Sequence, residues 1–230
     1  MNRGQLNTQA SLFAGDPTKS RYTGLYDNAA NQAQDQFAMD CRALWKDATD
    51  TTVDGTATYD LPTDFMYEDY VILDGKPLGP ITRNRLHELS PGDDWTEDEG
   101  RPTHYTIDPE EAQKKIRLYP TPQAGDADKT ISIRYFPKPA AMTADSDEPL
   151  NSSDLMVQFH LGLAAFQAWL LLMTETMPSQ EQNLKKQELL TVYNDAVAKA
   201  QDTFKNTVSA PMRVRPRKSW GNSGWGIGQK

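Results

Sequence analysis

The chain has 230 residues, 37% of them hydrophobic and 24% charged, which is enough for one large domain or two small ones with a sizeable core. Its 24 Lys and Arg against 32 Asp and Glu give a net charge of −8, which argues against tight binding to a nucleic-acid backbone, because that needs clustered basic residues. The single cysteine, Cys41, excludes an internal disulfide framework and suits a reducing compartment.

Neither membrane insertion nor secretion is indicated. The longest apolar run, Leu161–Met173, is interrupted by Gln167 and is too short to cross a bilayer. The first fifteen residues lack the apolar core of a signal peptide. We therefore expect a soluble protein that is made in a cytoplasm and has no membrane partner.

The first predicted element is an amphipathic helix that begins at Tyr22 and ends before residues 49–54. The turn Asp16–Thr18 precedes it as a helix-start signal. Apolar or small residues recur every three or four positions and so share one face. These residues are Tyr22, Tyr26, Ala29, Ala30, Ala33, Phe37, Cys41, Leu44 and Trp45.

The second zone, residues 53–139, is predicted to form a small antiparallel sheet. Alternation of apolar and polar residues is typical of half-buried strands. The dipeptide Asp74-Gly75 predicts a hairpin, and Thr82–Leu89 a short helix. The expected strands are Thr56–Leu61, Tyr70–Leu73, Lys76–Ile81, His104–Ile107, Lys115–Tyr119 and Thr130–Phe136.

The third zone, residues 140–207, is predicted to be helical again. A long helix from Leu155 to about Thr176 is apolar nearly all round, which indicates burial on more than one side, within the chain or at a subunit interface. Pro178 ends it, and Gln180–Asn206 is a second, amphipathic helix. The residues expected to pack this bundle or a ring contact are Phe159, Leu163, Phe166, Trp169 and Leu170.

The last segment, residues 208–230, differs in charge from the rest. It carries five basic residues and no acid, whereas residues 1–207 carry 19 basic against 32 acidic residues. Tryptophan and arginine dominate interface hot spots, so an interaction arm is predicted, with a disordered solubilising terminus as the alternative. The candidate contact residues are Met212, Arg213, Arg215, Arg217, Lys218, Trp220 and Trp225.

No catalytic or metal-binding constellation is predicted, and no cofactor. The histidines His87, His104 and His160 have no metal-ligand spacing. We interpret His160 as a hydrogen-bonded core or interface residue, His104 as a strand side chain and Cys41 as a buried small hydrophobe. The acidic loop at residues 93–99 fails the calcium-loop pattern. The chain is therefore expected not to be an enzyme.

The fold class predicted from these zones is α+β. Helices from residues 1–52 and 140–207 form one bundle, a small antiparallel β lobe of residues 53–139 is inserted between them, and residues 208–230 form an extended arm.

The order of several short segments resembles a known family. They are LYDNAANQAQDQFAMDCRALW, YDLPTDFMYEDYVILDGKPL, GRPTHYTID, KIRLYPTP, ISIRYFPKP and DEPLNSSDLMVQFHLGLAAFQAWLLL. In this order, across residues 20–205, they resemble the head-to-tail adaptor (connector) proteins of short-tailed and related tailed bacteriophages.

The resemblance implies a structural virion protein, made in the host cytoplasm and located in the tail or neck. Such adaptors form a ring, usually of twelve copies, beneath the portal protein. They extend the channel through which double-stranded DNA passes without specific binding. They give the tail nozzle and the tail fibres a platform, and a C-terminal arm clasps the portal.

Two other readings stay open at this point. One is a tail-associated enzyme or carbohydrate-binding module that acts through the β lobe. The other is a general interaction scaffold outside a virion. An enzyme should bind a small ligand alone, whereas an adaptor should be inert until it meets a ring partner.

Overall fold

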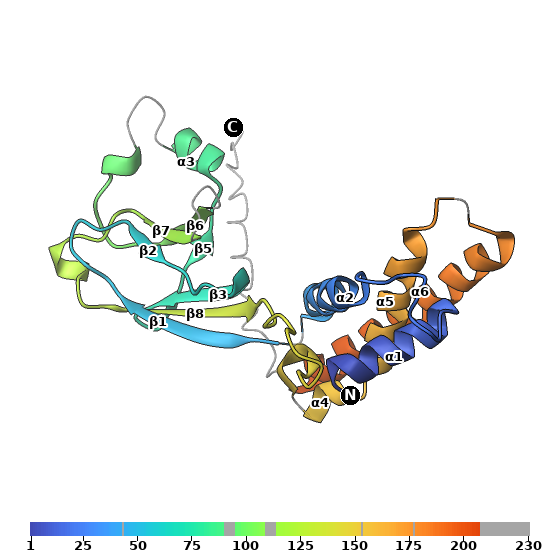
Figure 1. Ribbon diagram of the computed structural model, residues 1–230. Coiled ribbons are helices and arrows are strands. Elements are labelled where there is room, and N and C mark those ends of the chain that lie inside the picture. The colour runs from blue at the N-terminus through green and yellow to red at the C-terminus, as the bar shows by residue number, and fades with distance from the viewer. Residues whose placement is uncertain (43, 90–94, 109–113, 153, 177, 208–230) are drawn as a thin grey trace, which may run out of the picture.

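The computed structural model describes residues 1–42, 44–89, 95–108, 114–152, 154–176 and 178–207. It has a helical part and a sheet part that lie next to each other (Figure 1). The predicted α+β class is confirmed. The helical part holds α1 (Arg3–Ala14), α2 (Tyr26–Cys41), the turn η3 (Pro149–Ser152), α4 (Asp154–Val157), α5 (His160–Met173) and α6 (Gln180–Thr207).

Helix α5 is the centre of the helical part. It packs against α1, α2 and α6, and of its side chains only those of Leu161 and Met173 are exposed. One hydrophobic cluster joins α5 to α2 and α6, and a second joins it to α1 and α2. The nearly all-apolar sequence of α5 thus has its physical reason in three neighbouring helices of the same chain.

Helix α1 was not predicted from the sequence. Its ends are well defined: Asn2 and Gln5 form a capping box, and Gly15 ends the helix in the left-handed region at φ 74°. Its buried face is built mostly from small or polar residues, which hide the helical period. That face consists of Arg3, Leu6, Asn7, Ala10, Ser11 and Ala14.

Helix α2 is shorter than predicted, and a strand follows it. The helix begins at Tyr26 and ends at Cys41, where Arg42 turns the chain with φ 48°. Leu44 and Trp45 therefore lie beyond it. Strand β1 (Lys46–Thr51) occupies residues expected to belong to the helical zone, so that expectation was wrong. The sequence KDATDT has no apolar alternation, because β1 is a largely exposed edge strand.

The sheet part contains two four-stranded sheets, where the sequence predicted one. One has the order β1-β8-β3-β4 and the other β2-β7-β6-β5, and among these strand pairs of the described residues only β5–β6 is parallel. A shared core of alternating side chains from both sheets lies between them. The remaining elements are β2 (Thr58–Asp60), β3 (Phe65–Leu73), β4 (Lys76–Pro77), β5 (Gly79–Pro80), α3 (Arg83–Leu89), η1 (Trp95–Glu97), β6 (His104–Asp108), β7 (Lys115–Tyr119), η2 (Ala124–Asp126) and β8 (Thr130–Pro137).

The hairpin at Asp74-Gly75 is confirmed. Both residues have positive φ, 49° and 75°, as a tight two-residue turn between β3 and β4 requires. The predicted return strand Lys76–Ile81 is split, since β4 pairs with β3 while β5 joins the other sheet. The strands predicted around β2, β6, β7 and β8 and the short helix α3 are also confirmed.

The C-terminal helices agree with the prediction except at one point. The helix expected from Leu155 to Thr176 is divided into α4 and α5, with Gln158 and Phe159 between them. The second predicted helix is confirmed as α6.

The chain passes between the two parts at neighbouring places. It enters the sheets at β1 and leaves them at the end of β8, and these two strands pair with Lys46 opposite Tyr135. Across the junction the Tyr67 hydroxyl donates to the Met39 carbonyl at 2.9 Å. Lys138 just after β8 pairs with Asp35 of α2 at 3.2 Å.

Candidate functional site

The residues predicted to form the arm cannot be placed. Met212, Arg213, Arg215, Arg217, Lys218, Trp220 and Trp225 all lie outside the described residues. Their role as an interaction arm therefore stays a prediction. Among the hollows in the described part of the chain, two have the larger volumes of about 670 Å³, one between α5 and α6 and one between the helices and the sheets.

The five predicted packing residues all lie on or beside α5. Phe159 and Leu163 are buried in the cluster shared with α2 and α6. Phe166, Trp169 and Leu170 are half-buried and pack against the helical clusters. Phe166 stacks on both Trp169 and Tyr193, with ring centroids 5.2 Å and 4.3 Å apart. Their part in a ring contact stays a prediction.

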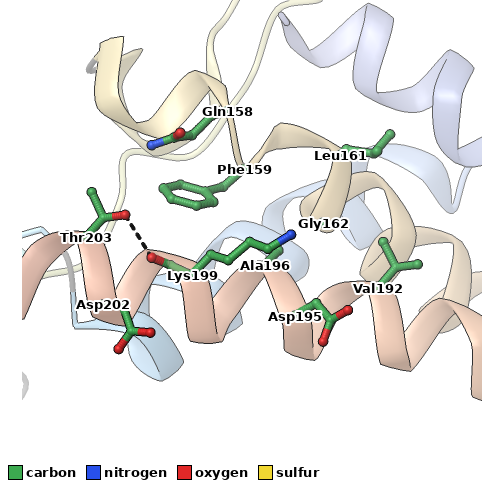
Figure 2. Close-up of a pocket in the computed structure, with 10 residues that line it drawn as sticks. All are labelled: Gln158, Phe159, Leu161, Gly162, Val192, Asp195, Ala196, Lys199, Asp202 and Thr203. Atoms are coloured by element: carbon green, nitrogen blue, oxygen red, sulfur yellow. Dashed lines mark hydrogen bonds between the residues drawn. The ribbon is translucent and has the colours of Figure 1, made fainter.

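The first hollow is a groove of about 670 Å³ between the start of α5 and the second half of α6. Figure 2 shows the Phe159 ring lying between Gln158 and α6. At the floor, the two helices nearly touch: a Cβ added to Gly162 would lie 2.4 Å from the Ala196 Cβ. Only glycine allows this approach, because any larger side chain would have to push the helices apart.

Exposed apolar and charged side chains border this α5–α6 groove. Leu161 and Val192 are 50% and 42% exposed. Lys199 extends along the groove over Ala196, while Asp195 and Asp202 point away from α5 (Figure 2). Apolar side chains flanked by charges are typical of a protein contact surface rather than of a small-molecule site. Sequence reasoning missed this groove, although a glycine within an apolar helix was the available signal.

The second hollow, the junction cavity, also measures about 670 Å³ and lies between the end of α2, α6 and the outer side of β8 and β3. Trp45 is 44% exposed at its rim. The Arg134 guanidinium lies 4.2 Å from the centre of the Trp45 ring and 5.1 Å from that of Tyr70. Arg134 also bonds Asp47 at 2.9 Å, so the tryptophan is held in place although half of it faces solvent.

Carboxylates give the junction cavity a polar side. Asp40 accepts hydrogen bonds from the Tyr193 hydroxyl at 2.6 Å and from the Gln36 amide at 2.9 Å. Burial first, and then this contact with Asp40, raises the pKa of Tyr193 far above its usual range, so its hydroxyl keeps its proton. Asp69 is exposed and has no ion-pair partner among the residues described.

The histidines agree only in part with their interpretation. His104 is a side chain of β6, as expected, and Cys41 is buried on α2. His160 is buried, 1% exposed, but neither ring nitrogen has a hydrogen-bond partner among the described residues, so the expectation of a hydrogen-bonded histidine was wrong. Burial, followed by the positive amino terminus, lowers the pKa of His160 to about 4.

Neither a metal site nor a membrane-spanning helix is found among the described residues. Within those ranges no group of three or more His, Cys, Asp or Glu side chains is arranged to hold a metal ion. Each described helix is too short or too polar to cross a membrane. The predicted acidic loop lies partly outside the described residues, at Asp93 and Asp94.

Comparison with known families finds a match that covers most of the chain. The family model described as SU10 adaptor protein matches residues 1–215, which cover both parts of the structure and both hollows. No curated protein matches the chain.

Proposed function

Because the chain belongs to the SU10 adaptor protein family and is thus a structural adaptor of a bacteriophage, we propose that it forms a ring between the portal and the distal tail. The ring extends the DNA channel and carries the nozzle and fibres. Its twelve copies follow from the resemblance to head-to-tail adaptors. The family match over residues 1–215 is the observation that carries this proposal. It also favours a structural role over the enzyme or carbohydrate-binding alternative.

In this proposal the helical part makes the lateral contact with the neighbouring copy. Phe159 and Leu163 are buried within the chain, so they stabilise the bundle itself. Phe166, Trp169 and Leu170 support it from half-buried positions. The exposed Leu161 and Val192 beside the α5–α6 groove then remain as apolar surface that a neighbour can cover.

The portal contact is assigned to residues 208–230. Such a segment orders on docking, which costs free energy but allows it to wrap a wide surface. The alternating Arg213, Arg215 and Arg217 suit addition to a sheet edge, and Trp220 and Trp225 serve as anchors. Met212 and Lys218 extend the same contact.

The charge of the remaining chain suits a DNA channel. Residues 1–207 carry 13 more acidic than basic residues, since 19 Lys and Arg stand against 32 Asp and Glu. Backbone affinity for DNA depends on positive contacts, so an acidic wall lets the duplex slide past without holding it. No cofactor is needed for this role.

The test mixes purified portal rings with the full chain and with a chain that ends at Thr207, followed by electron microscopy. If only the full chain adds a ring beneath the portal, residues 208–230 are the docking arm. If both add a ring, the adaptor proposal stands but the arm assignment is wrong.

A control is needed for folding, because the shorter chain must be intact for the comparison to count. Both chains should show the same cooperative melt by circular dichroism. If neither folded chain binds portal rings, the adaptor proposal fails, and a ligand screen of the sheet part becomes the next experiment.

A further inference from the structure

We propose that Trp220 of the C-terminal segment docks into the junction cavity of its own chain, with the preceding basic residues placed against Asp69. This contact is intramolecular and belongs to the unassembled chain, so it goes beyond the proposed function. Trp220 would leave the cavity when residues 208–230 dock on the portal. Three features support the contact: the lining of the cavity, the place where α6 ends and the chemistry of the segment.

The junction cavity is a preformed aromatic site. Trp45 is fixed by the Arg134 guanidinium, which Asp47 holds from its other side. Phe136 and Phe204 line the cavity and are both half-buried. The tryptophan is rigid and half-exposed, and other aromatic side chains stand beside it. Covering these side chains with another aromatic ring is favourable in free energy.

Helix α6 ends beside this cavity, so the C-terminal segment begins close to it. Gln201 and Phe204 line the cavity from the last turns of α6, and the helix ends at Thr207. Trp220 lies thirteen residue steps beyond Thr207, a span of up to about 43 Å at 3.3 Å per residue. The chain is therefore long enough to turn back and place an indole in a cavity that begins one helical turn away.

Charge favours the same occupant. The cavity's two arginines, Arg42 and Arg134, lie over the rings of Tyr67 and Trp45. Asp69 at the rim makes no ion pair within the described residues, although its charge also acts on Arg134. The residues that precede Trp220 include Arg213, Arg215, Arg217 and Lys218, with no acid among them. Their positive charges are attracted by the strongly acidic remainder of the chain.

The α5–α6 groove is the competing site for the segment. It has similar volume, but only one aromatic side chain, Phe159, lines it. Its lining also carries Asp195 and Asp202, so charge alone does not separate the two sites. The junction cavity fits an indole better because three aromatic side chains, those of Trp45, Phe136 and Phe204, line it.

The experiment uses the full chain labelled with 5-fluorotryptophan, whose five tryptophan resonances are assigned by single Trp→Phe variants. A nitroxide is attached at position 219 in a Cys41→Ala, Ser219→Cys chain. We expect the Trp45 resonance to broaden, while Trp95 and Trp169, which pack against Tyr119 and Phe166, stay sharp. The broadening should not change on dilution.

Matched variants identify the site. Trp220→Ala should abolish the broadening of Trp45, and Asp69→Lys should reduce it at least severalfold. Val192→Lys, an equally exposed site in the α5–α6 groove, should leave it unchanged. Asp69 and Val192 are both on the surface, so neither substitution is expected to unfold the chain.

Three results would overturn the proposal. The first is a Trp45 resonance unaffected by the nitroxide. The second is broadening that is lost in Val192→Lys, which would place the segment in the groove. The third concerns a mixture of chains that carry only fluorotryptophan with chains that carry only the nitroxide. If the Trp45 resonance broadens only in this mixture, the contact is intermolecular. None of these outcomes bears on portal binding.

Discussion

At the scale of single residues, the stability of the helical part depends on two positions. One leaves no room for a larger side chain, and the other buries a polar side chain without a hydrogen-bond partner among the described residues. Gly162 permits the close approach of α5 and α6, and Ala196 opposite it is small for the same reason. His160 is the first residue of α5 and is buried there without a hydrogen bond to any described residue. Both positions lead to quantitative predictions about the free energy of unfolding.

Replacing Gly162 with alanine should destabilise the protein. Overpacking costs about 1 to 3 kcal/mol, and the better helix propensity of alanine returns up to about 1 kcal/mol. We expect a net loss of about 1 to 2 kcal/mol in urea unfolding, partly recovered in the double variant Gly162→Ala, Ala196→Gly. The control is Gly125→Ala, where a Cβ meets no atom within 4 Å. An unchanged urea midpoint for Gly162→Ala would contradict the close contact.

His160 should make stability depend on pH. Its folded pKa of about 4 lies below the ordinary 6.5, so the unfolded chain binds a proton first. The free energy of unfolding should therefore fall as the pH drops from about 6.5 to about 4, by roughly 2 to 3 kcal/mol. Glu148 and the amino terminus are the charges that act on this ring.

The variant His160→Leu isolates this effect from the carboxylates that also titrate at low pH. It removes a buried polar group without partners, so it should be at least as stable as wild type at pH 7. The difference in unfolding free energy between the two proteins should widen as the pH falls to 4. A constant difference would show that His160 does not titrate in this range.

At the scale of elements, helices and strands with a regular apolar pattern could be predicted from the sequence, and those with a weak pattern could not. Helix α6 and strands β7 and β8 were predicted because a regular apolar pattern faces a core on one side. Helix α1 was missed because its buried face includes Arg3 and Asn7, whose side chains find their distant partners only in the folded chain. Strand β1 was missed because pairing with β8, and not hydrophobicity, makes it a strand.

The two hollows could not be predicted for a related reason. Each is made by segments far apart in the sequence, such as Trp45 and Phe204 at the junction cavity. A local pattern placed Trp45 on a helix face, whereas Arg134 of β8 determines its position. The predicted packing residues on α5 were found because they belong to one continuous helix.

Helix α5 supplies the prediction at this scale. Trp169→Asp should unfold or strongly destabilise the helical part, by about 3 kcal/mol or more, because it replaces a half-buried ring stacked on Phe166 with a charge. Leu161→Asp is the matched control, since that side chain is 50% exposed and lies in the first turn of α5, where an acid is tolerated. A wild-type melting curve for Trp169→Asp would argue against a central α5.

At the scale of the whole molecule, two hydrophobic cores meet at a narrow junction. The sheets have their own core, and the helices have two clusters of their own. Few contacts tie them together, among them Tyr67 to Met39 and Lys138 to Asp35. The stability of each part should therefore depend mainly on its own core.

A chain in which residues 46–137 are replaced by a short glycine-serine linker tests this. The linker has only to span neighbouring strands, about 4.8 Å apart. We expect the product to keep a helical circular dichroism spectrum and a cooperative melt, at a lower midpoint because the junction contacts are lost. A chain of the same residues carrying Trp169→Asp is the negative control. Loss of cooperativity in the unsubstituted product would mean that the helices require the sheets.

The adjacency of β1 and β8 also bears on how such a protein can change over generations. Since the chain leaves and re-enters the helices through paired strands, Lys46 facing Tyr135, any insert whose first and last strands are antiparallel neighbours meets the same two attachment points. Recombination between viral genomes could exchange the sheets as a cassette while the helices stay the same. The sheet part of such an adaptor could thus be replaced without rebuilding the helices.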